Sequence, residues 1–346
     1  MDSNLNNLKD YEFNFSEVIE YAKKHKVSIV GIQLPEGLRR MQNVLAERVK
    51  CELGCEVIIS TEPCVGACDI ADEEFLNLGA DILLHFGHSK IPCLSKTSLP
   101  VFYIECRSNM DVENVVNDSL NKFVNGEKVG ILTTVQHVHK VNEISNILSK
   151  GKLTPIVSKG DCRIAYPAQV LGCNFSTARE EIKNGADSFL FVGSGYFHPL
   201  GVAISTKRKV IVADPYSNEV KEIDGVNNEI VNKIMRQRFG AIAKAKDAKS
   251  FAILVGTKKG QSRLGCALEL KRMIEKHSFQ VFLYSVGRIE PEYLRYYNED
   301  AIVSTLCPRV AIDDFSRFNK PILTPIELQI LLEEKDWNEF AFDEII

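Results

Sequence analysis

Residues 62–69 read Glu62-Pro63-Cys64-Val65-Gly66-Ala67-Cys68-Asp69, with one cysteine on each side of a glycine. The β-branched run at residues 57–59 before them predicts a buried strand, and the acidic stretch at residues 71–78 after them predicts a helix. A glycine-containing loop therefore presents Cys68 between the end of a strand and the start of a helix. In an α/β sheet, ligands bind at this end of the strands.

Two further cysteines occupy comparable places far along the chain. Cys173 lies in Gln169-Val170-Leu171-Gly172-Cys173-Asn174, and Cys307 lies in Leu306-Cys307-Pro308-Arg309. Three thiols from three distant segments are thus expected at strand ends. Thiolates are the usual ligands of iron–sulfur clusters, but free cysteine is also one of the most often buried residues. Spacing alone leaves both interpretations open.

The composition is that of a soluble globular protein, with 45% apolar and 25% charged residues in 346. This length suggests two or three domains. No apolar run approaches the roughly 18 residues that span a bilayer, and the beginning of the sequence lacks a signal-peptide pattern, so we expect a cytoplasmic protein without a membrane segment. The 42 basic and 46 acidic residues give a net charge of −4, which argues against nucleic acid as a partner.

Ten cysteines are many for a cytoplasmic chain, where disulfides are disfavoured. No pair has the CxxC spacing typical of structural zinc sites. Apart from Cys64 and the three cysteines at strand ends, the remaining ones are interpreted as structural: Cys51, Cys55, Cys93, Cys106, Cys162 and Cys266.

Alternating strand and helix patterns recur three times along the chain. Gly79-Ala80-Asp81 and Gly185-Ala186-Asp187 introduce the third strand of the first two passes, and a basic helix at residues 229–248 leads into the third. We predict three divergent α/β domains at residues 1–107, 108–220 and 221–346, each with a small parallel sheet and right-handed crossovers. The alternative is that any α/β protein shows such alternation.

Six segments, spread in order over nearly the whole chain, together resemble the archaeal-type diphthamide synthase family, the enzymes that make 2-(3-amino-3-carboxypropyl)histidine. They are residues 33–40 (Gln-Leu-Pro-Glu-Gly-Leu-Arg-Arg), 66–69, 169–174, 193–201 (Gly-Ser-Gly-Tyr-Phe-His-Pro-Leu-Gly), 258–261 and 307–314. The resemblance implies three related Rossmann-like domains around one central 4Fe–4S cluster. It carries the role of cluster ligand to Cys68, Cys173 and Cys307. Val65 stands where the family usually has tyrosine, and Cys64 is an extra thiol that could replace Cys68.

The resemblance also implies the reaction. S-Adenosylmethionine binds the iron that no cysteine holds, and an electron from the cluster cleaves the bond between sulfur and the methionine Cγ. The resulting 3-amino-3-carboxypropyl radical adds to one histidine of translation elongation factor 2, the first step of diphthamide biosynthesis. A homodimer and an external electron donor are expected. The sequence lacks the CxxxCxxC of the usual radical enzymes.

Residues beside the two predicted helix starts at Gly37 and Gly260 are candidates for binding the amino-acid end of S-adenosylmethionine, because free backbone N–H groups there favour a carboxylate. These candidates are Gln33, Glu36, Gly37, Lys259 and Gln261. Ordinary helix capping explains them equally well.

Other polar residues have less specific patterns. His88 and His198 follow strands near glycines and are interpreted as core histidines, with the pocket as the alternative. Arg309, with Asp313 and Asp314, is a candidate to hold the Cys307 loop or to contact the protein partner. The basic helix is expected to expose its cations on a solvated face, with docking of the protein substrate as the alternative; these cations are Lys233, Arg236, Arg238, Lys244 and Lys246.

Two other functions fit parts of this pattern. A quinolinate synthase-like dehydratase also has three α/β domains and a three-cysteine cluster, which acts as a Lewis acid on a small substrate. A cluster-bearing partner that passes electrons to a catalytic subunit is the other. The run at residues 193–201 and the full set of three cysteines in one chain favour the transferase.

Overall fold

The structure is a computed structural model that describes residues 9–94, 96–312 and 317–345. The chain forms two compact units. Unit 1 comprises Met1–Val170, Ser176–Gly195 and Ile211–Lys221, and unit 2 comprises Leu171–Phe175, Tyr196–Val210 and Glu222–Ile346. The division into three domains at residues 107 and 220 stays a prediction.

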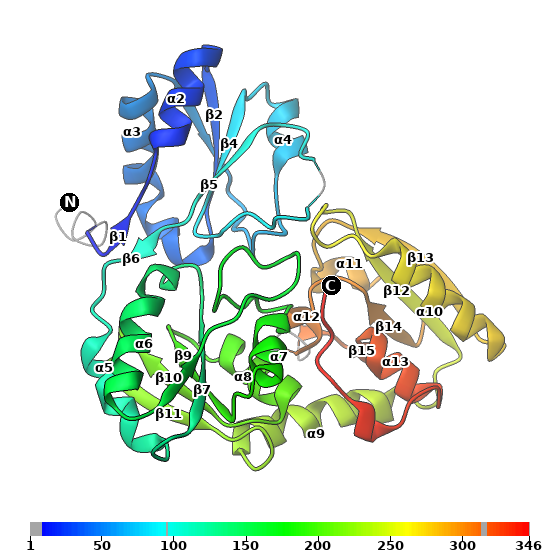
Figure 1. The fold of residues 1–346 in the computed structure, drawn as a ribbon. Helices are drawn as coiled ribbons and strands as arrows, with labels where there is room; N and C mark the ends of the chain where they lie inside the picture. The colour runs from blue at the N-terminus through cyan, green and yellow to red at the C-terminus, as the bar shows by residue number, and fades with distance from the viewer. Residues whose placement is uncertain (1–8, 95, 313–316, 346) are drawn as a thin grey trace. The chain divides into compact units, whose positions relative to one another are not determined.

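Unit 1 begins with a four-stranded sheet in the order β3-β2-β4-β5, whose neighbouring strands are all parallel (Figure 1). The central strand β4 is wholly buried, as its apolar sequence predicts. Helices α2 and α3 pack against one face of the sheet, and α4 packs against the other. The bounds are β2 Ile29–Gln33, β3 Glu56–Ile59, β4 Ile82–Phe86, β5 Val101–Ile104, α2 Ser16–His25, η1 Glu36–Met41, α3 Gln42–Leu53 and α4 Asp72–Asn77.

A second sheet of unit 1 has the order β11-β10-β9-β7-β8. Its β7 pairs in parallel with both β8 and β9, and α5 and α6 cover one face. Strand β11 was not expected, because its sequence Glu-Val-Lys-Glu-Ile has little apolar character. The bounds are α5 Glu113–Ser119, η2 Leu120–Lys122, β7 Lys128–Thr133, η3 Val138–Lys140, α6 Val141–Lys150, β8 Thr154–Ile156, α7 Ser176–Lys183, β9 Ser188–Val192, β10 Val210–Asp214 and β11 Glu219–Ile223.

The two sheets of unit 1 are joined at the carboxyl ends of their strands. A short antiparallel pair, β1 (Tyr11–Glu12) and β6 (Arg107–Ser108), links the segments before and after the first sheet. The Gln136 side chain, after β7, donates to the carbonyl of Gly87, after β4, at 2.7 Å. The carboxyl ends of the strands of both sheets therefore lie in the same region of unit 1.

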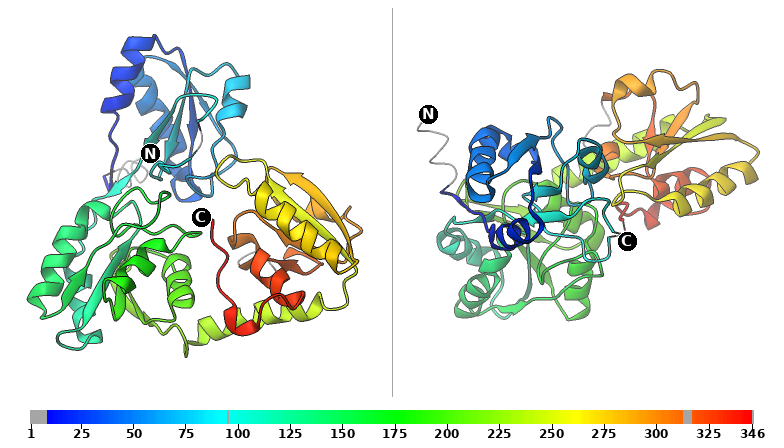
Figure 2. Two further views of the ribbon diagram at one scale, coloured as in Figure 1. Left: turned by 45° about the vertical axis from the view of Figure 1, so that its right-hand side comes forward. Right: turned by 90° about the horizontal axis from the view of Figure 1, so that it is seen from above.

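Unit 2 contains a parallel sheet in the order β13-β12-β14-β15. Helices α9, α10 and α13 share one apolar core with one face of the sheet, and α11 and α12 lie on the other face (Figures 1 and 2). Helix α13 begins with a capping box formed by Thr324 and Glu327. The bounds are α8 Phe197–Thr206, α9 Glu229–Lys244, β12 Ser250–Gly256, α10 Leu264–Lys276, β13 Gln280–Val286, α11 Pro291–Leu294, β14 Ala301–Ser304, α12 Arg309–Ile312, β15 Ile322–Leu323, α13 Pro325–Leu331 and η5 Trp337–Glu339.

The three sheets share a strand order and an aspartate. In each sheet the first strand of the pass lies between the second and the third, with the fourth beside the third. Asp81, Asp187 and Asp300 each stand just before the third strand and accept hydrogen bonds from backbone N–H groups at the start of the first strand, at 2.7–3.1 Å. The α/β class and the parallel sheets predicted from the sequence are confirmed.

One prediction about the basic helix α9 is wrong. The Arg238 side chain is buried at 1% exposure and pairs with the equally buried carboxylate of Glu327 at 2.6 Å. It also donates to the carbonyls of Ala311 and Ile322. The cation therefore holds α9 against α12, β15 and α13 and is not part of a solvated face.

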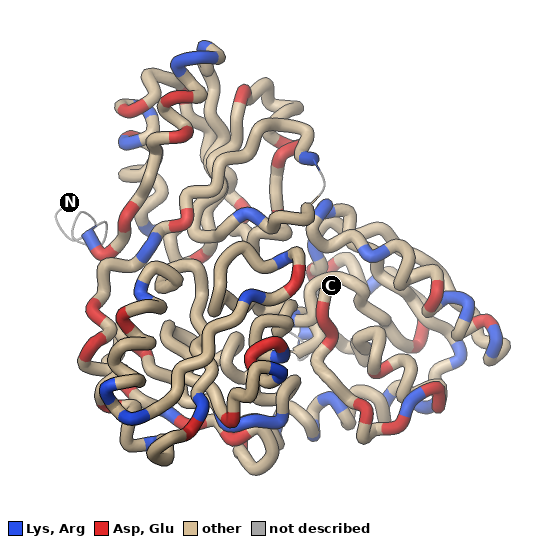
Figure 3. The backbone as a smooth tube through the Cα atoms, in the orientation of Figure 1, with Lys and Arg blue, Asp and Glu red and all other residues tan. Residues whose placement is uncertain are grey.

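Charged residues of both signs are interspersed along each unit (Figure 3). This distribution fits the small net charge of −4. Among the residues that the structure describes, no helix is long and apolar enough to cross a membrane.

Candidate functional site

The Cys68 loop follows β3 in unit 1 and is attached to the end of the neighbouring strand β2. The Cys64 N–H donates to the Leu34 carbonyl at 3.0 Å, and Cys64 forms a parallel bridge with Pro35. The Asp69 carboxylate closes the loop by accepting from the Val65 N–H at 3.2 Å. Cys68 itself is buried, at 7% exposure. The strand-end position predicted for this thiol is therefore where the structure places it.

The Cys173 loop starts in a comparable way. Gln169 forms a parallel bridge with Thr133 at the end of β7, so the bridge lies four residues before Cys173, as Cys64 lies four before Cys68. A Cβ atom at Gly172 would come within 2.5 Å of the Phe197 ring. Glycine is required there because the ring of Phe197 covers the backbone next to Cys173.

The C-terminal segment of unit 2 holds the Cys173 loop in place. The Ile345 N–H donates to the Cys173 carbonyl at 2.9 Å, and the Asn174 side chain donates to the Ile345 carbonyl at 3.2 Å. The Phe175 N–H donates to the Glu344 carboxylate at 2.7 Å. We refer to residues 340–345 as the C-terminal strap.

The strap is anchored in turn to the start of α10. The Arg263 guanidinium binds the Asp343 carboxylate through two hydrogen bonds, at 2.6 and 3.0 Å, and both side chains are largely buried. Burial alone would lower the pKa of Arg263, but the bonds to Asp343 and the charges of Cys266 and Cys173 raise it. Arg263 thus places a positive charge near the Cys173 thiol.

The Cys307 loop lies at the end of β14 in unit 2, with α12 directly after it. The Cys307 thiol is half-buried. The Arg309 guanidinium stacks over the Phe197 ring, 4.4 Å from its centroid. Since the same ring covers Gly172, Phe197 links the Cys307 loop to the Cys173 loop. Asp313 and Asp314, expected to help hold this loop, lie outside the described residues.

Unit 2 therefore brings two of the three predicted ligand loops together, and Cys68 belongs to unit 1. None of the ten cysteines, all of which lie within the described residues, forms a disulfide. Of the six interpreted as structural, three are exposed and so contribute nothing to a core, namely Cys51, Cys93 and Cys162.

The five candidates for binding S-adenosylmethionine lie in different surroundings. The Gln33 amide is buried, accepts from the Ala71 N–H and contacts the His85 ring, so it is already used within unit 1. Glu36 is exposed and lies 3.6 Å from Arg39. Gly37 has open space where a side chain would stand. In unit 2, Lys259 is half-buried and Gln261 is buried.

Sequence reasoning missed the residues that position these loops. Phe197, Arg263 and the strap act through contacts between segments far apart in the chain, for which a single sequence gives no signal. His85 was also missed, although its spacing of three from His88 at a strand end could have revealed a pair of imidazoles. Their ring nitrogens lie 3.0 Å apart.

A family model described as putative diphthamide synthesis protein matches residues 34–341. The chain belongs to this family. The 2-(3-amino-3-carboxypropyl)histidine synthases of Pyrococcus horikoshii and Methanocaldococcus jannaschii are 36% and 29% identical to it. These alignments cover 97% and 94% of this chain and 94% and 90% of the relatives. The resemblance to diphthamide synthases inferred from sequence motifs is confirmed.

A solved structure of a diphthamide synthesis protein matches over the same extent. It is Dph2 from Pyrococcus horikoshii with a 4Fe–4S cluster, which aligns with a TM-score of 0.86 at 36% identity and covers 97% of this chain and 94% of that one. The α/β fold with small parallel sheets is therefore that of Dph2, and the chain is a member of an enzyme family.

Proposed function

We propose that this protein is a 2-(3-amino-3-carboxypropyl)histidine synthase, a transferase that moves the 3-amino-3-carboxypropyl group of S-adenosylmethionine to a histidine of translation elongation factor 2. The observation that carries the proposal is the 36% identity, over 97% of the chain, to a relative of that name whose structure contains a 4Fe–4S cluster. The matched relatives favour this transferase over a quinolinate synthase-like dehydratase or an electron-transfer partner.

The residues of this chain fit a 4Fe–4S cluster held by three ligands. None of Cys68, Cys173 and Cys307 forms a disulfide, and each follows a strand of a parallel sheet. Two of the thiols are buried and the third is half-buried, so cysteine ligands would be shielded from water. Three thiolates satisfy three irons, and the fourth iron would remain open to substrate. In this proposal, three related Rossmann-like domains surround the cluster, as the shared strand order and the three aspartates suggest.

When bound, the cluster supplies the electron for cleavage of the bond between sulfur and Cγ of S-adenosylmethionine. The chain's own residues do the positioning. Arg263 places a positive charge near Cys173, while the strap and the Phe197 ring fix the backbone on either side of that residue. The Cys173 loop is thereby ordered before the reaction begins.

The amino-acid end of S-adenosylmethionine requires a group that binds a carboxylate. We assign this role to two separate candidates: the N–H groups around Gly37, with its open space, in unit 1, and Lys259 with Gln261 in unit 2. Glu36 is a candidate for the amino group of the same amino-acid end. Gln33 is assigned to positioning, because its amide is already hydrogen-bonded to Ala71. A homodimer, an external electron donor and a cytoplasmic location complete the proposal.

The proposal is tested with anaerobically purified protein. We expect about four irons per chain, lost on replacing Cys68, Cys173 or Cys307 by Ala and kept in the matched control Cys162→Ala, whose thiol is exposed. With dithionite and S-adenosylmethionine, the adenosyl product should be 5′-methylthioadenosine. Full iron content in Cys307→Ala would reject the ligand set, and 5′-deoxyadenosine as the main product would reject the reaction.

A further inference from the structure

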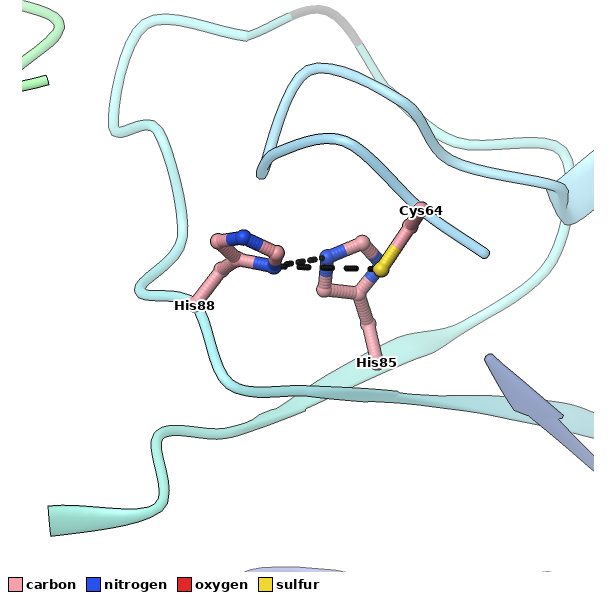
Figure 4. A group of neighbouring side chains, drawn as sticks. All are labelled: Cys64, His85 and His88. Carbon is pink, nitrogen blue, oxygen red and sulfur yellow. Dashed lines mark hydrogen bonds between the residues drawn. The ribbon is translucent and has the colours of Figure 1, made fainter. Parts of the chain in front are cut away.

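Three side chains of types that bind metal ions converge in unit 1, apart from the three cysteines assigned to the cluster. The Cys64 thiol and the rings of His85 and His88 place one ligand atom each within 4.8 Å of the others (Figure 4). The Nε2 atom of His85 lies 3.0 Å from Nδ1 of His88, and this Nδ1 lies 3.9 Å from Sγ of Cys64. Three ligand atoms of two chemical types thus point at one another.

The backbone around this group is fixed by the first sheet. Cys64 is paired with the end of β2, and His85 belongs to the buried strand β4, directly beside β2. Between the two histidines, Gly87 has a positive φ of 78°. The backbone therefore turns after β4, and the ring of His88 contacts that of His85. A side chain at this position would also come within 2.8 Å of the Pro35 ring. The first sheet and the turn at Gly87 therefore bring the three side chains together.

A buried amide sets the tautomer of His85. The Oε1 atom of Gln33 accepts from the Ala71 N–H at 3.2 Å and lies 3.1 Å from Nδ1 of His85. Since an oxygen cannot donate, Nδ1 carries the proton and Nε2 presents its lone pair toward His88 and Cys64. Ligand histidines in metal sites almost always donate their other nitrogen in this way.

Two of the three distances between the ligand atoms are close to the edges of a tetrahedral site, and the third, between His85 and Cys64, is below 4.8 Å. With zinc bonds of roughly 2.0–2.1 Å to nitrogen and 2.3 Å to sulfur, tetrahedral angles separate two nitrogens by about 3.3 Å and a nitrogen from the sulfur by about 3.5 Å. The observed 3.0 and 3.9 Å each differ from these values by less than half an ångström. Without metal, the same atoms form a hydrogen-bonded chain from Gln33 through the two histidines, so the ligands stay ordered.

We propose that Cys64, His85 and His88 bind a single divalent metal ion, zinc by ligand type, at the carboxyl end of the first sheet. Two imidazoles and one thiolate suit mononuclear zinc, whereas 4Fe–4S clusters are held by thiolates. The three protein ligands leave a fourth position for water or a substrate group. Because Cys64 stands four residues before Cys68, the metal also anchors the loop that presents that thiol.

The experiment measures zinc and iron separately in the anaerobic, cluster-loaded full chain. We expect about one zinc per chain in addition to the iron. Cys64→Ala should lose the zinc and keep the iron, Cys68→Ala should lose iron and keep the zinc, and Cys162→Ala should keep both. Titration with Co²⁺ alone should give the near-ultraviolet band of a thiolate–cobalt bond, absent in Cys64→Ala and weakened in His88→Gln.

Each contrary result overturns the proposal. Zinc binding unchanged in both Cys64→Ala and His88→Gln would reject this ligand set, and a wild-type chain that binds neither zinc nor Co²⁺ would reject the site. Loss of iron in Cys64→Ala with iron retained in Cys68→Ala would assign Cys64 to the cluster. If Cys64→Ala does not fold, as judged by circular dichroism, Cys64→Ser and His88→Gln decide between these outcomes. Zinc content does not depend on turnover, so failure here is distinct from failure of the proposed transferase.

Discussion

Replacing Asp343 by Ala removes the anchor of the C-terminal strap. In the wild type its carboxylate accepts two hydrogen bonds from Arg263, whose side chain is 17% exposed, and Asp343 itself is 4% exposed. The variant leaves the guanidinium largely buried without a counter-ion. It also frees the strap that binds the Cys173 carbonyl through Ile345.

The size of the effect follows from this burial. Removing one partner of a fully buried pair costs about 3–5 kcal/mol, whereas exposed pairs contribute about 0–1 kcal/mol. The residual exposure of Arg263 places Asp343→Ala between these limits, at roughly 2–3 kcal/mol of unfolding free energy for unit 2. With a urea slope of about 1–3 kcal/mol per molar, the unfolding midpoint should fall by roughly 1 M.

The single tryptophan of the chain makes this measurable within unit 2. Trp337 packs against Phe340, the first residue of the strap, with ring centroids 4.8 Å apart, and against Phe239 with centroids 5.4 Å apart. Its fluorescence during urea unfolding therefore reports on the strap and α9. Iron content after anaerobic purification gives the second readout, because the proposed ligand Cys173 loses its backbone support.

Glu334→Gln is the matched control. Glu334 pairs with Lys276 in the same unit, but that lysine is 74% exposed, so the midpoint should hardly move. The double variant Arg263→Leu with Asp343→Leu should recover part of the loss, since no buried charge is left alone. A midpoint for Asp343→Ala as high as that of Glu334→Gln would refute the reasoning.

Three further outcomes are expected. Gly172→Ala should destabilise unit 2 by about 1–3 kcal/mol in urea unfolding, because its Cβ would overlap Phe197, whereas Gly265→Ala, with open space, should not. Arg238→Met should cost about 3–5 kcal/mol, and a loss below 1 kcal/mol would contradict its buried pairing. Burial lowers the pKa of His137 from 6.5 to about 4, so the unfolded chain binds the proton first and the unfolding free energy should drop by roughly 3 kcal/mol between pH 7 and 4. That slope should flatten in His137→Phe, and an unchanged slope would contradict this pKa.

The amino-acid sequence was sufficient to predict those elements whose structure is determined by local patterns of residues. The buried strands β4, β9 and β14 are largely apolar runs, each preceded by an aspartate, and their positions were predicted to within two residues. The cysteine loops were located because a strand pattern, a small residue and a helix pattern follow in order. In contrast, β11 was missed because a charged edge strand lacks the apolar signal.

Long-range contacts account for the remaining errors. Arg238 lies on a helix with three other cations, so only its pairing with Glu327, 89 residues away, reveals that it is buried. Cys64 and His85 meet because β2 and β4 are neighbours in the sheet, a fact of register that spacing along the chain does not contain. The strap reaches the Cys173 loop across 169 or more residues.

The most direct measurement of the central claim is group transfer itself. The chain, as the only cluster protein present, is incubated anaerobically with dithionite, elongation factor 2 and S-adenosylmethionine labelled in its carboxyl group. The account predicts that the label appears on a single histidine of elongation factor 2, with 5′-methylthioadenosine formed in equal amount. Label transfer that persists after that histidine is replaced, or no transfer by a fully iron-loaded chain, would contradict it.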